Sequence, residues 1–177
     1  MRLLTALLVA MLSGACGQTH SSAPPPVAEA VSLQGRYRAA SDSALTLTGD
    51  LAIERGGLMF ANGVVLYTRT LNPRRGLDIT ARNGESYAAI AVGPAELAVE
   101  LRHVNEQVVA PGVRSLCGED TPSYVALAYE ERATSVTLMV FAGEEPPSPE
   151  ATQSRLCGTY AYTAPDGART RQGVVLR

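Results

Sequence analysis

Short apolar runs with a period of two recur from Leu33 onward, and they constrain the fold of this chain more than any other feature. In the first half, apolar residues alternate with polar or small ones at Tyr37, Leu45, Leu47, Leu51, Ile53, Leu58, Phe60, Val64 and Leu66. Such alternation is typical of half-buried strands. Asn62-Gly63 lies between two of these runs and is a strong hairpin signal. This half of the chain is therefore predicted to form antiparallel strands.

The second half continues the pattern. Strands are predicted at Leu77 and Ile79, over the continuous small-apolar run 86–92, and with the clearest patterns over 123–130, 135–141 and 158–162. The tail 169–177 offers one more strand through Val174 and Leu176.

Residues 95–109 fit two interpretations. As a strand, the segment puts Leu97, Val99, Leu101 and His103 on one face and Glu96, Glu100 and Arg102 on the other. As a helix, it makes an apolar stripe of Leu97, Leu101, Val104 and Val108 behind Pro94. Recurrent valine and strand-like neighbours favour the strand. We predict an all-β fold, a single antiparallel β-sandwich or small barrel, with one short helix around 94–109 as the alternative for that segment.

Residues 1–15 have the pattern of a secretory signal peptide. Arg2 gives a basic start, residues 3–12 are almost wholly apolar, and small residues precede Cys16. The apolar run has about half of the ~20 residues that a membrane-spanning helix needs. We expect export, a Pro/Ser-rich tether over 16–32 and one β-rich periplasmic domain over 33–177.

The segment Leu12-Ser13-Gly14-Ala15-Cys16 resembles the lipobox of bacterial lipoproteins. The resemblance implies that the thiol of Cys16 carries a diacyl lipid, that the leader is cut before it, and that the new amino terminus is acylated. Gly17 follows where inner-membrane retention usually uses aspartate, which favours an outer-membrane anchor with the domain in the periplasm. Cleavage after Ala15 by the general signal peptidase, giving a soluble periplasmic protein, is the alternative.

The cysteine count fits this picture. Three cysteines leave an odd thiol in an exported protein, unless lipid occupies Cys16 and Cys117 pairs with Cys157. Both of the latter follow Leu and precede Gly, and adjacent strands that start in register would bring the two sulfurs together. Two buried free thiols are the alternative. Neither cysteine has a second ligand at the spacing that zinc sites use.

Two further resemblances concern the fold and the last third of the domain. Gly35-x-Tyr37 resembles the start of lipocalin and avidin barrels. Uncharacterised proteobacterial lipoproteins are similar at Leu116-Cys117-Gly118, Tyr124-Val125-Ala126-Leu127, Val136-Thr137-Leu138, Gly143-Glu144-Glu145-Pro146-Pro147 and Leu156-Cys157-Gly158-Thr159-Tyr160. This second resemblance implies export and a disulfide, and it implies no activity.

Composition and motifs argue against catalysis and nucleic-acid binding. The 15 basic residues, all arginine, face 17 acidic ones, so no basic patch for nucleic acid is expected. The absence of lysine excludes Schiff-base and serine-lysine chemistry. His103 is the only histidine of the domain, and we interpret it as a surface polar residue. The acidic pairs Glu119-Asp120, Glu130-Glu131 and Glu144-Glu145 are interpreted as solvated turns. No cofactor or metal is expected.

Two function classes remain. The first is a non-catalytic module that contacts an envelope protein, with the stiff proline-rich loop Glu144, Glu145, Pro146 and Pro147 as its contact element. The second is a lipocalin-like carrier of a small apolar ligand, because the alanines of 88–91 and 126–128 could leave room inside a barrel. The first class is the expectation.

Overall fold

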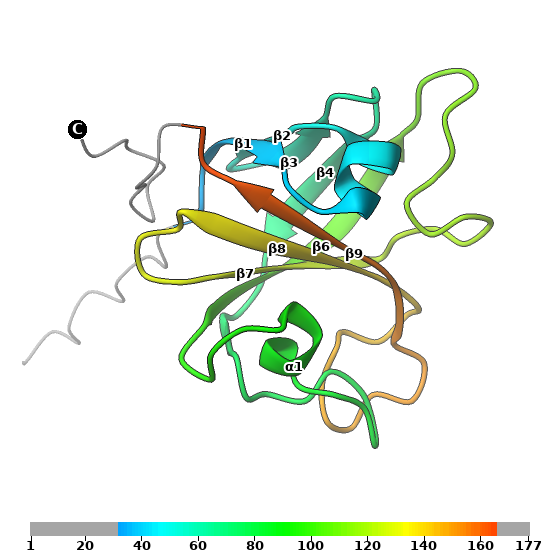
Figure 1. Cartoon of the computed structure of the whole chain (residues 1–177). Coiled ribbons are helices and arrows are strands. Elements are labelled where there is room, and N and C mark those ends of the chain that lie inside the picture. Colours follow the sequence, from blue (N-terminus) through cyan, green and yellow to red (C-terminus); the bar gives the residue numbers. More distant parts are fainter. Residues whose placement is uncertain (1–31, 166–177) are drawn as a thin grey trace, which may run out of the picture.

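Residues 32–165 form a closed, eight-stranded antiparallel β-barrel in a computed structural model of the chain, and these are the residues that the structure describes (Figure 1). The barrel strands are β1 (Gly35–Ala39), β2 (Leu51–Glu54), β3 (Gly57–Phe60), β4 (Val65–Thr70), β6 (Ala98–Val108), β7 (Tyr124–Tyr129), β8 (Ser135–Ala142) and β9 (Arg155–Thr163). Each strand pairs with the barrel strands before and after it, and β1 pairs with β9 to close the ring. The prediction of an all-β fold is confirmed in its barrel form.

The up-and-down strand order gives the barrel two ends. The entry end carries residues 32–34, the turns 55–56 and 130–134, and residues 164–165. The loop end carries the connections 40–50, 61–64, 109–123 and 143–154. In Figure 1 the β7–β8 turn marks the entry end on the left, and the long 109–123 connection marks the loop end on the right.

Large side chains fill the interior of the barrel. Among those at most 5% exposed are Tyr37, Leu51, Ile53, Leu58, Phe60, Leu66, Val125, Leu127, Tyr129, Leu138, Tyr160 and Tyr162. They come from alternate positions along the strands, as a period of two requires. Because burying one such side chain contributes about 1.5–3 kcal/mol, this interior is the main source of the stability of the fold.

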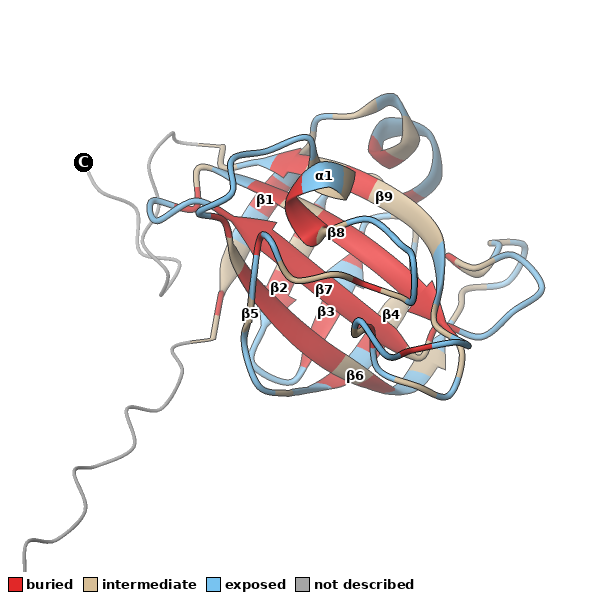
Figure 2. Ribbon diagram, turned by 90° about the horizontal axis from the view of Figure 1, so that it is seen from below, coloured by how far each residue is buried: buried red, intermediate tan, exposed pale blue. Residues whose placement is uncertain are grey.

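A second core lies outside the barrel, against the outer face of β6–β8. The segment 71–97 covers this face and includes β5 (Arg74–Arg75), which pairs with β6, and the helix α1 (Tyr87–Ala91). Figure 2 shows α1 lying on this wall. Strand β7 is buried on both faces, since Ala126 and Ala128 contact the outer core while Val125 and Leu127 face the interior.

The expected strand over 86–92 is wrong, because the chain forms α1 there. The hydroxyl of Ser86 accepts a hydrogen bond from the backbone N–H of Ala89, which caps the helix start. Alanine favours a helix, and Val92 ends the helix in the left-handed region at φ 52°. The small residues that suggested a strand thus allow close packing of a helix.

Most of the segment 95–109 forms the strand β6, which begins at Ala98 and ends at Val108, so the preferred interpretation is confirmed and the helix alternative is wrong. Of the predicted charged face, Glu100 and Arg102 point into the barrel, whereas Glu96 lies before β6 and is exposed. Leu97, Val99 and Leu101 pack outward under the covering segment, and Glu100 and Arg102 are buried.

Two more local predictions differ from the structure. Leu45 and Leu47 lie on a short π-helix, η1 (Ala44–Thr48), with 63% and 54% of their surfaces exposed. The hydroxyl of Thr48 holds this turn through Ala44 O and the Tyr162 hydroxyl. Ile79 makes only an isolated bridge with Ser86.

The predicted hairpin at Asn62-Gly63 is confirmed, since it joins β3 to β4. Gly63 has φ 91°, and Asn62 Oδ1 accepts a hydrogen bond from the backbone N–H of Val64. The predicted strand in the tail 169–177 lies outside the described residues.

Candidate functional site

A buried ion pair sits inside the barrel at the entry end. Nε of Arg102 donates to Oε1 of Glu100 at 2.8 Å, and the two residues are 0% and 5% exposed. A buried charge without a partner destabilises a fold strongly, so each member of this pair depends on the other. The other hydrogen bonds of the two side chains show what the pair does in the fold.

Other hydrogen bonds of this pair hold the backbone that enters the barrel and the ends of β2 and β4. Arg102 donates to the carbonyl oxygens of Leu33 at 3.0 Å and of Glu54 at 2.7 Å. Oε2 of Glu100 accepts from the N–H of Leu33 at 2.6 Å, and the Ser32 hydroxyl bonds to both charged groups. Leu33 itself is fully buried. We call residues 32–33 the strap, and the arrangement is a clamp on this strap rather than an open reaction site.

Sequence reasoning missed this clamp because it separated the two faces of residues 95–109 without deciding which of them lines the interior. The sequence signal that could have revealed the buried Glu100–Arg102 pair is the apolar character of the opposite face of the strand. Leu97, Val99 and Leu101 need a covering layer, and if that layer lies outside the barrel, Glu100 and Arg102 must face inward.

A disulfide joins Cys117 to Cys157, as predicted, with a Cα–Cα distance of 4.9 Å. The strand-register argument for it is wrong in detail. Cys117 lies in the β6–β7 connection and not on a strand, and β8 separates β7 from β9. The bond therefore ties the connection to β9 across the loop end.

Other contacts hold the same connection down. Leu116 is buried in the barrel interior, and its carbonyl oxygen accepts a hydrogen bond from the Tyr160 hydroxyl at 3.5 Å. The side chains of Asp120 and Arg155 form an ion pair at the surface. These contacts fasten the β6–β7 connection to the barrel, while Glu119 on this connection remains exposed.

The predicted contact loop, residues 144–147, is held against the outer core. The Tyr124 hydroxyl donates to Glu144 O at 2.9 Å, and the Tyr87 hydroxyl donates to Pro147 O at 3.4 Å. Burial raises the pKa of Tyr87 to about 12, so it remains a donor at neutral pH. Pro147 is buried, which leaves Glu144 and Pro146 as the exposed members of the loop.

The carboxylate of Glu145 serves its own loop. It accepts hydrogen bonds from the backbone N–H groups of Thr152 at 2.6 Å and Gln153 at 3.1 Å. These two bonds lower the pKa of Glu145, because they favour the charged form. Glu145 is therefore committed to holding the β8–β9 connection in shape.

His103 lies on β6 with its ring edge-to-face against Tyr124 at 5.2 Å between ring centroids. Its Nδ1 is 3.0 Å from Oδ1 of Asn105. In the part of the chain that the structure describes, neither contact supplies the nucleophile or second acid that a histidine-based site would use.

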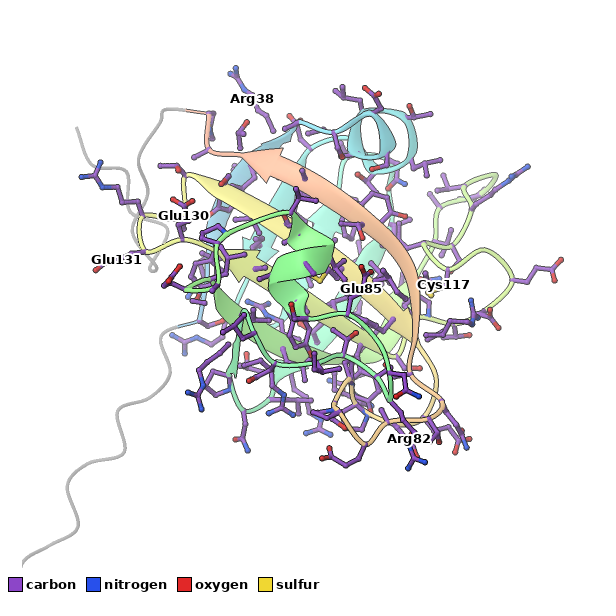
Figure 3. The ribbon with its side chains drawn as sticks, turned by 60° about the horizontal axis from the view of Figure 1, so that its bottom comes forward. Arg38, Arg82, Glu85, Cys117, Glu130 and Glu131 are labelled. Atoms are coloured by element: carbon purple, nitrogen blue, oxygen red, sulfur yellow. A yellow bond between two sulfur atoms is a disulfide. The ribbon has the colours of Figure 1, made fainter. Side chains whose placement is uncertain are left out.

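The acidic pairs are dispersed over the molecule. Glu130 and Glu131 follow β7 on the turn at the entry end, and Figure 3 shows them on the opposite side of the molecule from Cys117. Asp120 pairs with Arg155, and Glu145 caps its own loop. Within residues 32–165, no three histidine, cysteine or acidic side chains gather as a metal site would require.

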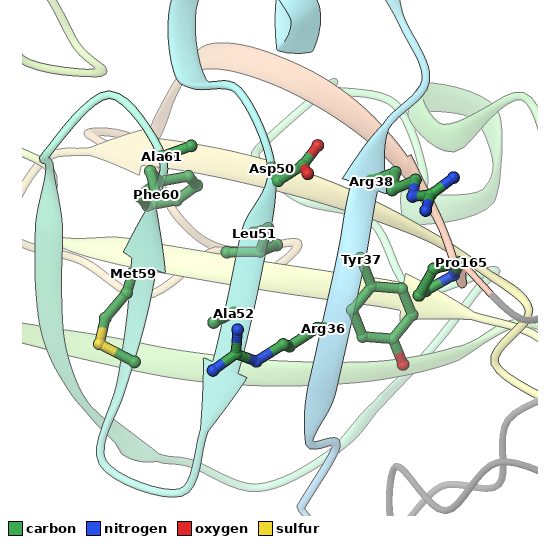
Figure 4. Close-up of a pocket in the computed structure, with 10 residues that line it drawn as sticks. All are labelled: Arg36, Tyr37, Arg38, Asp50, Leu51, Ala52, Met59, Phe60, Ala61 and Pro165. Atoms are coloured by element: carbon green, nitrogen blue, oxygen red, sulfur yellow. The ribbon is translucent and has the colours of Figure 1, made fainter.

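A groove of about 410 Å³ lies on the outer face of β1–β3. Outward-facing Arg36, Arg38, Asp50 and Met59 surround the small side chains Ala52 and Ala61, and Pro165 completes one side. Figure 4 shows the Arg36 side chain in front of β2 beside Ala52, and Pro165 beside Arg38. The groove exists because small residues on β2 and after β3 lie between long neighbours.

The Cys16 lipidation prediction lies outside the described residues. No helix within residues 32–165 is long and apolar enough to cross a membrane. No family model, curated protein or solved structure matches the chain.

Proposed function

We propose that this protein is a membrane-anchored cell-envelope lipoprotein that acts by contact with another envelope protein and not by catalysis. One observation carries the proposal. The chain enters the barrel at one end, through the strap, and its long connections 109–123 and 143–154 are fastened at the other (Figure 1). A tether of residues 16–31 would therefore leave the fastened loops facing away from the membrane.

The fastened loops have the properties of a protein contact surface. A disulfide and an ion pair hold the first loop, and two tyrosine hydroxyls hold the second. Loops that are ordered before binding lose less entropy when a partner docks. Glu119, Glu144 and Pro146 project from these loops and supply the exposed contacts.

The carrier alternative loses its original support. Ala126 and Ala128 pack against the outer core with Ala88, so they leave no room inside the barrel. The interior positions of β7 hold Val125, Leu127 and Tyr129 instead, all at most 5% exposed. A small ligand would have to displace side chains of this kind to enter.

The anchor is tested by Cys16→Ser. We expect the wild-type protein to carry acyl chains and to sediment with the outer membrane, because the modified cysteine would insert lipid into it. The variant should appear as soluble periplasmic protein or as uncleaved precursor. Mass spectrometry of the amino terminus after cell fractionation measures both properties. Wild-type protein that starts at Cys16 without lipid and stays soluble would contradict the anchor.

Protein contact at the loop end is tested by site-specific photocrosslinking in cells. A crosslinking residue at position 119 or 144 should capture a discrete protein, because both positions are exposed on fastened loops. The matched control is position 131, an exposed glutamate at the entry end. We expect no equivalent product from it, as judged by mass spectrometry of the adducts.

Two results would overturn this function. One is equal capture from position 131 and from the loop end, which would remove the assignment of the surface. The other is a hydrolytic activity that stays with the purified protein and disappears in His103→Ala. A lipid or small molecule that purifies with the barrel would favour the carrier instead.

A further inference from the structure

The outer face of β1–β4 has apolar side chains in contact with solvent. Ala52 pairs with Met59, Met59 with Val65, and Val65 with Val108, so one row crosses β2, β3, β4 and β6. Met59 is 38% exposed and Val108 is 44% exposed. The equivalent face of β6–β8 is covered by α1 and its flanking segment (Figure 2).

Two arginines stand at one end of this row, in the groove. The side chains of Arg36 and Arg38 have no hydrogen-bond or ion-pair partner within residues 32–165. The nearby Asp50 accepts a hydrogen bond from the backbone N–H of Ala39. The groove thus combines an apolar floor with positive charge on the β1 side.

The chain itself supplies a segment of matching chemistry. Pro165 lines the groove and is the last described residue, and the following residue is Asp166. Asp166 is thus the chain neighbour of a residue that lines the groove. Pro165-Asp166-Gly167 is also a turn-forming sequence, which would send the chain back over the barrel wall after β9.

In the sequence after that turn, a period of two would separate apolar from basic residues, with the polar Thr170 and Gln172 on the apolar side. With a period of two, Ala168, Val174 and Leu176 share a face, and Arg169, Arg171 and Arg177 share the other with Val175. If the face with Val174 and Leu176 docks on the barrel, the arginines of the segment point away from Arg36 and Arg38. Val174 is nine residues beyond Pro165 and reaches up to ~30 Å, whereas the row from β1 to β6 spans four strand spacings, about 19 Å.

We propose that residues 166–177 dock in the groove on β1–β3, with Val174 and Leu176 against the Met59 row and Asp166 beside Arg38. The segment covers the apolar face as α1 covers the β6–β8 wall. Any partner of this face must displace it first. The proposal does not depend on the loop-end contact, which lies elsewhere on the barrel.

Oxidation of Met59 by dilute peroxide tests the proposal. We expect Met59 to form its sulfoxide about tenfold more slowly in the full chain than in a chain that ends at Pro165, the ratio for a docking free energy of ~1.4 kcal/mol. Met139 is fully buried and serves as an internal reference for intact folding. Peptide mass spectrometry measures both rates.

A matched pair of substitutions removes the ambiguity of truncation. Val174→Asp should raise the Met59 rate to that of the shortened chain, whereas Val175→Asp, the same change one residue along, should leave it slow. Equal Met59 rates in the full and shortened chains would overturn the proposal, and so would indistinguishable effects of the two variants. Slow oxidation in both chains that becomes fast on dilution would assign the groove to a second copy, which also overturns it.

Discussion

Replacing Arg102 with alanine is expected to lower the free energy of unfolding by about 3–5 kcal/mol, because it leaves Glu100 charged and buried inside the barrel. The guanidinium also provides hydrogen bonds to the carbonyl groups of Leu33 and Glu54, and those acceptors would lose their donor. Chemical denaturation of wild type and variant, analysed with a common slope, measures the difference.

Three variants separate the charge effect from the loss of one large side chain. Arg69→Ala removes an exposed strand arginine of the same size and should change stability by less than about 0.5 kcal/mol. Glu100→Ala should be about as harmful as Arg102→Ala, since it leaves the opposite charge buried. Glu100→Leu combined with Arg102→Met removes both charges and should recover part of the loss.

The clamp also predicts a local effect. The Leu33 N–H donates to Glu100 at 2.6 Å, so its hydrogen exchange should accelerate in Glu100→Ala more than exchange in the centre of β7. If Arg102→Ala costs less than about 1 kcal/mol, or if Leu33 exchange is unchanged, the pair does not fasten the strap.

The period of two predicted most of the barrel because each strand has one face in a continuous interior. On β2, Leu51 and Ile53 are two positions apart, as are Leu58 and Phe60 on β3, and all four side chains lie in the same core. The pattern could not choose between a sandwich and a barrel. That choice depends on pairing between β1 and β9, which are far apart in the chain and share only a short register.

Two of the errors arose where a second layer covers the barrel. Ser86 and the alanines after it form a helix because a cap and an adjoining apolar wall are both present, and only the first is visible in the sequence. The inward turn of Glu100 and Arg102 has the same origin. A face that is apolar can point to an interior or to a covering segment, and the alternation is identical in both cases.

The groove on β1–β3 could not be predicted at all. Arg36, Ala52 and Met59 come from three strands, and they form one row only through the register of those strands. In the sequence, each is an ordinary residue of an amphipathic strand. By contrast, the Cys117–Cys157 bond was predictable from the count of cysteines, although its position in the fold was not.

Replacing both Cys117 and Cys157 with alanine is expected to destabilise the protein by about 4 kcal/mol, the chain-entropy estimate for a crosslink between residues 40 apart in sequence. For a domain of this size, such a loss lowers the melting temperature by roughly 10–20 °C. Calorimetry with and without reductant measures it. Reductant should bring the wild type down to the variant and leave the variant unchanged.

The loss of stability without the disulfide should appear first at the loop end of the barrel. Apart from an isolated bridge between Ser115 and Gly118, the β6–β7 connection has no regular pairing. Without the disulfide it is held by the burial of Leu116, its hydrogen bond from Tyr160 and the exposed Asp120–Arg155 ion pair, which contributes little. We therefore expect faster hydrogen exchange over 109–123 while β7 and β8 remain protected.

This local loosening links the disulfide to the proposed contact. A connection that opens must be ordered again before a partner can dock, so photocrosslinking from position 119 should fall in the double variant more than crosslinking from position 144. The 144 site is fastened independently by Tyr124 and Tyr87. Equal losses of crosslinking at positions 119 and 144 would mean that the disulfide acts on the whole barrel. An unchanged melting temperature would mean that the other contacts suffice to hold the β6–β7 connection.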